Sequence, residues 1–189
     1  MSGASLTSSI WQAWRDVRAS MRTQMALPKE ENRLLFYVFL GCALGFVAGL
    51  PAALSQARLI EEEGAVTGVL VGRLFASIFF APLALYGVSA IATVITRAFG
   101  GKGSFYTGRL ALFWAVLVSL PILLVSGALG AAPLSPNVLG WISFAAYAVF
   151  LWVWSQCIAE GFGLRSGLPV VISLGILPLF LAFILKSMG

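Results

Sequence analysis

The residues of this chain that could perform chemistry are few. It has no histidine, a single aspartate (Asp16), two cysteines (Cys42 and Cys157) and a run of three glutamates at positions 61–63. A serine–histidine dyad and a histidine-ligated zinc site are therefore impossible, and a two-metal carboxylate site would lack ligands. The glutamate run could attract a cation weakly, but a solvated charge run beside a helix explains it equally well. The composition argues against an enzyme, and we expect neither a cofactor nor a metal.

A glycine-rich segment at positions 100–104, Gly-Gly-Lys-Gly-Ser, resembles a phosphate-binding loop at first sight. The Walker pattern requires a glycine at the position of Thr96 and a serine or threonine directly after Lys102, where this chain has Gly103. Both requirements fail. We therefore expect a flexible turn between two helices and no nucleotide site.

The hydropathy of the chain indicates which kind of helix carries these residues. The chain is 60% hydrophobic and 10% charged, with a mean hydropathy of +0.97, whereas soluble domains contain about 25% charged residues. The stretch 110–159 contains no charged side chain. Since about 20 apolar residues of helix cross a bilayer, this stretch is long enough to cross twice. Prolines and glycine at 130–137 break it, so it predicts two spans joined by a surface turn.

The whole pattern predicts an all-α polytopic membrane protein with five transmembrane helices and an N-terminal amphipathic helix. A cytoplasmic segment, 1–33, would precede a membrane domain, 34–189. The predicted spans are about 34–54, 66–96, 110–129, 138–159 and 168–185. The second span is unusually long, and Pro82 should bend it or open a gap in its hydrogen bonds.

The distribution of Lys and Arg predicts the orientation. With five spans, nine of the twelve basic residues fall on the side of the N-terminus and three on the other side. The positive-inside rule then places the N-terminus in the cytoplasm and the C-terminus outside. Topology and anionic lipid thus account for the net charge of +5, and no nucleic-acid partner is expected.

The N-terminal segment has an amphipathic pattern. Apolar side chains between Ile10 and Met25 recur at helical spacing, and most basic residues fall elsewhere around the helix. The residues predicted for a membrane-surface helix are Trp11, Trp14, Arg15, Arg18 and Arg22. One interpretation places this helix among the lipid headgroups, and the other packs it on the loops of its own chain or of a partner.

Glycines spaced four residues apart flank the loop between the first two spans. The predicted helix-packing residues are Gly41, Gly45, Gly49, Gly64, Gly68 and Gly72. Because lipid gives no hydrophobic drive for helix association, close approach through small residues is a main source of contact. We expect contact between the first and second spans, with a homo-oligomer through either face as the alternative.

Polar residues within the spans are candidates for a polar or partner site. Arg73 should lie one to two turns inside the outer interface, where it must extend toward water or pair, and the glutamates at 61–63 are nearest in sequence. Gln156 and Glu160, one turn apart, could line a polar entrance, hold Arg165 or be solvated. The tryptophans expected in interfacial belts are Trp114, Trp141, Trp152 and Trp154.

A loop motif after the long second span resembles that of the Yip-domain family of membrane proteins. The motif residues are Gly101, Lys102, Gly103, Ser104 and Phe105. The family is also similar in its five spans and cytoplasmic N-terminus, so the resemblance covers residues 34–185. Eukaryotic members interact with Ypt/Rab GTPases, but this chain lacks their Asp-Leu-Tyr-Gly-Pro element before the first span, so Rab binding is not implied. Bacterial members look closer, which implies a bacterial inner membrane.

These features predict a non-catalytic scaffold, accessory subunit or membrane-organising factor. Its expected partners are the lipid bilayer and another membrane protein or a second copy of the chain. The alternative is a small transporter, channel or lipid-handling protein. In that case Arg73, Gln156 and Glu160 would line the path.

Overall fold

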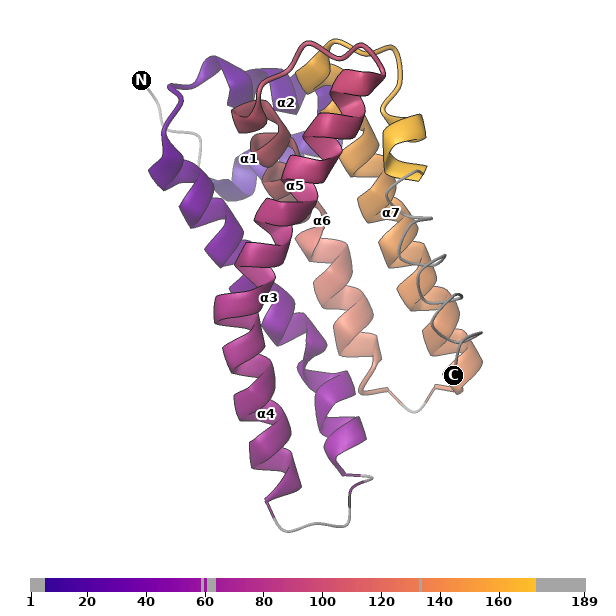
Figure 1. Ribbon diagram of the computed structural model, residues 1–189. Coiled ribbons are helices and arrows are strands. Elements are labelled where there is room, and N and C mark those ends of the chain that lie inside the picture. The colour runs from indigo at the N-terminus through magenta and orange to yellow at the C-terminus, as the bar shows by residue number, and fades with distance from the viewer. Residues whose placement is uncertain (1–5, 59, 61–63, 133, 173–189) are drawn as a thin grey trace, which may run out of the picture.

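The computed structural model describes residues 6–58, 60, 64–132 and 134–172, and every regular element in these ranges is a helix (Figure 1). The elements are α1 (Leu6–Ala13), α2 (Val17–Ala26), α3 (Glu31–Ala57), α4 (Ala65–Phe75), η1 (Ala76–Phe80), α5 (Ala81–Ala98), α6 (Phe105–Leu129) and α7 (Pro136–Phe162). The short element η1 is a single π-helical turn, so α4, η1 and α5 form one continuous rod.

Four helical segments are long and apolar enough to cross a membrane. They are Glu31–Ser55, Ala65–Ala98, Phe105–Leu129 and Asn137–Phe162. They correspond to the first four predicted spans, and this all-helical architecture fits an integral membrane protein. Most of the predicted fifth span, 168–185, lies outside the described residues, although its first residues, 168–172, are helical.

The first half of α6 is the centre of the bundle. Ten of the eleven side chains from Leu110 to Leu120 are at most 3% exposed, because α3, α5, α7 and α2 pack around this helix. A helix that is apolar on all sides is stable only when it is buried on all sides. Trp114 is one of these side chains, and Trp154 of α7 is also buried, so the prediction that these two lie in an interfacial belt was wrong. From Pro121 onward the side chains of α6 are half-buried or exposed.

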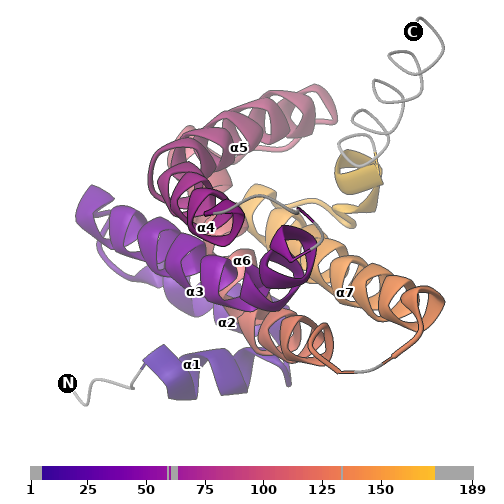
Figure 2. The same cartoon turned by 90° about the horizontal axis from the view of Figure 1, so that it is seen from below.

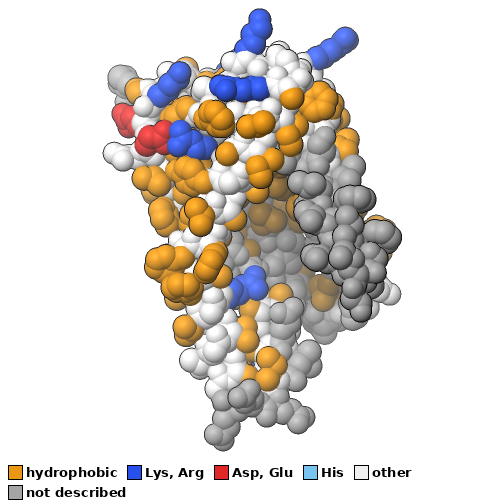
Figure 3. All heavy atoms as spheres, in the orientation of Figure 1, with side chains coloured by type: hydrophobic (Ala, Val, Ile, Leu, Met, Phe, Trp, Pro, Cys, Tyr) orange, Lys and Arg blue, Asp and Glu red, His pale blue; other side chains and the backbone are white. Residues whose placement is uncertain are grey.

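The helices converge at one end of the molecule and separate at the other. Figure 1 shows the α3–α4 and α6–α7 hairpins together at the top and apart at the bottom, and Figure 2 shows the same separation from below. The closed end contains the start of α3, the loop 99–104 and the end of α7. The open end contains the end of α3, the start of α4, the end of α6 and the start of α7. Lys and Arg side chains gather at the closed end (Figure 3), and its assignment to the cytoplasm stays a prediction.

The N-terminal segment forms two helices where the sequence suggested one. The break falls at Asp16, whose Oδ1 accepts a hydrogen bond from the backbone N–H of Ala19 at 2.9 Å and so caps α2. Aspartate favours such N-caps over positions inside a helix, and the amphipathic pattern does not reveal this competition.

This segment also shares a single core with the long helices. Met21 is fully buried, and the backbone of α2 lies against α6 and α7. The Ser20 hydroxyl accepts a hydrogen bond from Trp114 Nε1 at 3.1 Å, and the Gln24 side chain accepts one from the Tyr37 hydroxyl at 3.0 Å. The helices α1 and α2 therefore pack on the long helices of their own chain.

Replacing Met21 by alanine should lower the free energy of unfolding by about 2–5 kcal/mol, because it leaves a cavity in the shared core. Trp11 is 71% exposed, so Trp11→Ala should change the stability by less than about 0.5 kcal/mol. Unfolding of both variants in mixed SDS micelles, followed by circular dichroism, measures the difference. Equal losses in the two variants would contradict this packing.

Candidate functional site

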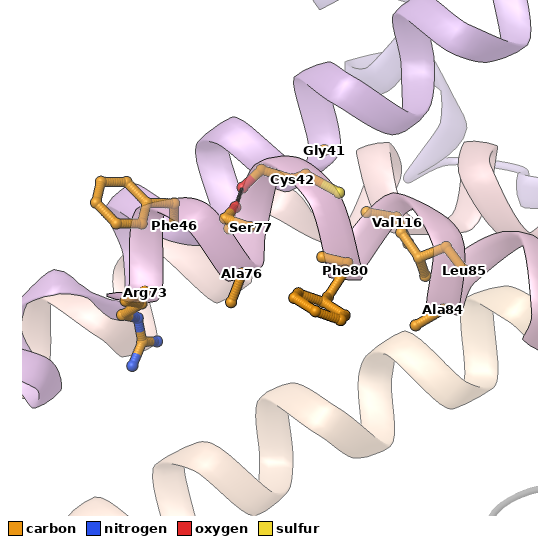
Figure 4. A pocket seen from close by; sticks show the side chains of 12 residues that line it. Gly41, Cys42, Phe46, Arg73, Ala76, Ser77, Phe80, Ala84, Leu85 and Val116 are labelled. Carbon is orange, nitrogen blue, oxygen red and sulfur yellow. Dashed lines mark hydrogen bonds between the residues drawn. The ribbon is translucent and has the colours of Figure 1, made fainter. Parts of the chain in front are cut away.

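A cavity of about 590 Å³ lies between α3 and the α4–η1–α5 rod (Figure 4). Its walls are almost entirely apolar, and Arg73 is the one charged residue that lines it. Gly45 and Cys42 contribute from α3, and Phe80 and Leu85 contribute from the rod. The candidate site is therefore an apolar groove with a cation near one end, and we call it the Arg73 groove.

The π turn sets which side chains of the rod face the groove. The N–H of Ala81 donates to the carbonyl of Ala76, five residues earlier, directly before Pro82. Proline has no N–H for the carbonyl four residues back, and a π turn absorbs the resulting change in register. The interruption predicted at Pro82 is thus present as a π turn. Arg73, Ala76, Phe80 and Ala84 point to the same side of the rod (Figure 4).

A polar contact fixes the rod to α3 at this turn. The hydroxyl of Ser77 donates a hydrogen bond to the backbone carbonyl of Cys42 at 2.9 Å. Ser77 has no distinctive sequence signal, because serine is common in membrane helices and its partner is a backbone atom. The proline five residues later was the available indication that the backbone here departs from a regular helix.

The glycines flanking the first loop do not form the predicted interlocking face. A Cβ atom built on Gly41 would lie 2.9 Å from Val116 Cγ1 of α6, and one on Gly49 would clash with the Arg73 guanidinium. An added Cβ would meet nothing within 4 Å at Gly45, Gly64, Gly68 and Gly72. α3 and α4 do contact each other, and of these six glycines Gly49 alone takes part in that contact, by leaving space for the Arg73 side chain. The small size of Gly45 contributes to the space of the groove instead.

Arg73 lies where two cavities adjoin. Its exposed side chain lies against Gly49, which lines a second cavity of about 680 Å³ between α3, α6 and α7, and Gly45 lines both cavities. The four carboxylates of the described residues, Asp16, Glu30, Glu31 and Glu160, belong to the elements of the closed end. Within the described ranges, therefore, no carboxylate pairs with Arg73.

The predicted polar pair on α7 contacts the N-terminal helix α2, a role outside the three predicted alternatives. Gln156 Oε1 accepts a hydrogen bond from Arg18 Nε at 2.7 Å, and Glu160 forms an ion pair with Arg22 at 3.1 Å. Arg18 also donates to the backbone carbonyl of Arg165 at 3.2 Å. Gln156 and Glu160 therefore hold α2 against α7, and their partners are Arg18 and Arg22, not the Arg165 side chain. Of the predicted surface-helix residues, Trp11, Arg15 and Arg22 are exposed.

The glycine-rich loop is packed against the end of α7, contrary to the expected flexible turn. The N–H of Lys102 donates to the carbonyl of Phe162 at 3.0 Å. A Cβ atom on Gly103 would lie 2.5 Å from Cδ1 of the Phe162 ring, and one on Gly101 would lie 3.1 Å from Phe162 Cβ. Sequence spacing could not show this, because Phe162 is distant in the chain.

The other residues of the motif stabilise the junction between α5 and α6. Ser104 caps α6 by accepting a hydrogen bond from the N–H of Thr107 at 3.2 Å. Arg97 Nε donates to the carbonyl of Gly103 at 3.1 Å, and the guanidinium carbon lies 4.9 Å from the centre of the Phe105 ring. The motif residues other than the exposed Lys102 side chain thus have structural roles in joining α5 to α6.

Gly103→Ala should destabilise the protein, because the new methyl group has no space beside Phe162, and we expect a loss of about 1–3 kcal/mol. Gly68→Ala is the matched control, since Gly68 is helical and has nothing within 4 Å of an added Cβ. It should raise stability by about 0.5–1 kcal/mol. Thermal unfolding in detergent checks both, and a loss from Gly68→Ala as large as that from Gly103→Ala would contradict this description of the loop.

Comparisons of this chain with protein-family models, with curated proteins and with solved structures each give no match. The resemblance to the Yip-domain family consequently rests on the sequence features alone, and membership of that family remains a prediction.

Proposed function

We propose that this chain is a non-catalytic integral membrane protein that binds a membrane lipid in the Arg73 groove. The supporting observation is the groove itself, which combines an apolar wall with one cation near its end. Amphiphiles combine the same two properties in one molecule. Binding sites of this kind are concave and mostly apolar, with a few polar groups that fix the orientation of the ligand.

The main alternative is transport of a solute across the membrane, which needs a path from the open end to the closed end. The side chains of Phe113, Trp114 and Leu117 are fully buried at the centre of the closed half. A solute path through the bundle would require these large side chains to move. A lipid needs only lateral entry into the groove from the bilayer, so the arrangement favours lipid binding.

Association with other membrane proteins or with a second copy belongs to the same proposal. α7 carries a row of exposed aromatic side chains, Trp141, Phe144 and Tyr147, which are 72%, 63% and 50% exposed. Such a face suits either lipid or a neighbouring membrane helix. The proposed role is that of a membrane-organising factor or accessory subunit in a bacterial inner membrane, with the N-terminus in the cytoplasm, as in the Yip-domain proteins it resembles.

Filling the groove tests this function. Gly45→Leu would place a side chain in the groove, whereas Gly68→Leu would place the same side chain outside it, and neither added Cβ meets an atom within 4 Å. Competition for occupied space costs about 1–3 kcal/mol, so Gly45→Leu should retain lipid about fivefold less well or worse. Gly68→Leu should retain as much as the unaltered protein.

Retained lipid can be counted by native mass spectrometry after extraction in mild detergent. Equal retention by both variants, or an unaltered protein that carries no lipid, would refute the proposed function.

A further inference from the structure

The packing of α3 on α6 indicates how deep Arg73 lies. The backbone of Ala48 lies so close to Gly127 that a Cβ there would overlap it, and the Arg73 guanidinium covers the adjacent Gly49. Gly127 precedes Gly130, at the end of α6, by three residues, which is about 5 Å of helix. The α6–α7 turn belongs at the membrane surface, because its backbone needs water. The guanidinium therefore lies near the level of the lipid headgroups.

The groove continues from this level toward the middle of the membrane. Its lining on the rod runs from Arg73 to Leu85, and twelve residues of helix measure about 18 Å. One leaflet of the hydrocarbon core is about 15 Å thick. The groove thus has the length of one leaflet, with the cation at its outer end and an apolar wall along the rest.

The charge of Arg73 calls for an anion that the described part of the protein does not supply. The ion pairs in that part, Arg22–Glu160 and Arg109–Glu31, both belong to the closed end. A guanidinium matches phosphate through two parallel N–H···O bonds, and such charge-assisted bonds are stronger than hydrogen bonds between neutral groups. A carboxylate could neutralise the charge but would leave the groove unfilled, whereas a phospholipid satisfies the cation and the groove together.

We infer that the Arg73 groove selects an anionic phospholipid from the leaflet on the Arg73 side. The phosphate is held by the Arg73 guanidinium, and one acyl chain lies along Gly45, Phe80 and Leu85. This inference rests on the proposed function, because it specifies the headgroup and leaflet of the lipid that the groove binds.

The test compares headgroups on the full-length protein. The protein is incubated in mild detergent with equal amounts of phosphatidylglycerol and phosphatidylcholine, and the retained lipids are counted by native mass spectrometry. Both lipids carry a phosphate, but the choline ammonium of phosphatidylcholine neutralises its headgroup and repels the Arg73 guanidinium. The unaltered protein should therefore prefer phosphatidylglycerol about tenfold, a difference equivalent to roughly one charge-assisted hydrogen bond. Arg73→Gln should retain lipid with little preference, and Arg73→Lys should keep a smaller preference, because it keeps the charge but loses the paired donors.

A second comparison tests whether the anionic partner of Arg73 is a lipid phosphate or one of the glutamates at 61–63. Changing residues 61–63 together from Glu to Gln should leave the preference unchanged if phosphate is the partner of Arg73. A clear rise in phosphatidylglycerol retention in that variant would show that the glutamates occupy Arg73 and would overturn the inference. If Arg73→Gln does not fold, Arg73→Lys decides, and a preference equal to that of the unaltered protein would overturn the inference.

The outcomes also separate this inference from the proposed function. Retention of both lipids without preference, reduced by Gly45→Leu, would leave lipid binding intact and refute selection by Arg73. Failure of the unaltered protein to retain either lipid would refute both proposals.

Discussion

The burial of the first half of α6 on every side is the constraint on which the rest of the structure depends. A helix with apolar side chains around its whole circumference needs neighbours around its whole circumference. The long helices α3, α5 and α7 supply most of them, and α1 and α2 supply the rest. Gly108 permits the approach of α5, since a Cβ there would overlap the Thr93 side chain. The N-terminal segment is therefore part of the core, and its basic residues meet polar partners on α7.

The open half of the molecule begins where the side chains of α6 are no longer buried. Pro121 interrupts the hydrogen bonding of α6 one residue after its last fully packed position. Beyond it the hairpins separate, and the space between α3 and the rod remains unfilled by side chains. Most of the charged and polar contacts between distant elements are made at the closed end. Arg73 stands apart from them in the open half, which is why we place the function there.

The long helices could be predicted from the sequence, because a helix that crosses a bilayer needs about 20 apolar residues in a row, and such a run is easily recognised. The position of the irregularity at Pro82 was also predictable, since a missing N–H has a local effect. Three other features depend on contacts between residues far apart in the chain. Gly103 is required by Phe162, Gln156 and Glu160 are partners of α2, and Gly41 faces α6 in place of α4. Periodicity identifies a face of a helix but does not name the neighbour that the face will meet.

Part of the candidate site could also be predicted from the sequence. Arg73 was identifiable as a charge within a span, and such residues are functional candidates by default. The groove beside it depends on the π turn and on the Ser77–Cys42 hydrogen bond, neither of which has a distinctive sequence pattern. The central claim is that this groove holds a lipid.

Photo-crosslinking in lipid nanodiscs tests this claim most directly, using a phospholipid that carries a diazirine in the middle of one acyl chain. Peptide mapping by mass spectrometry then locates the adducts. A lipid in the groove should concentrate adducts at 41–46 and 80–85, the two stretches that face each other across it. Adducts spread along the exposed face of α7, at Trp141 and Phe144, with none in those two stretches, would contradict the account.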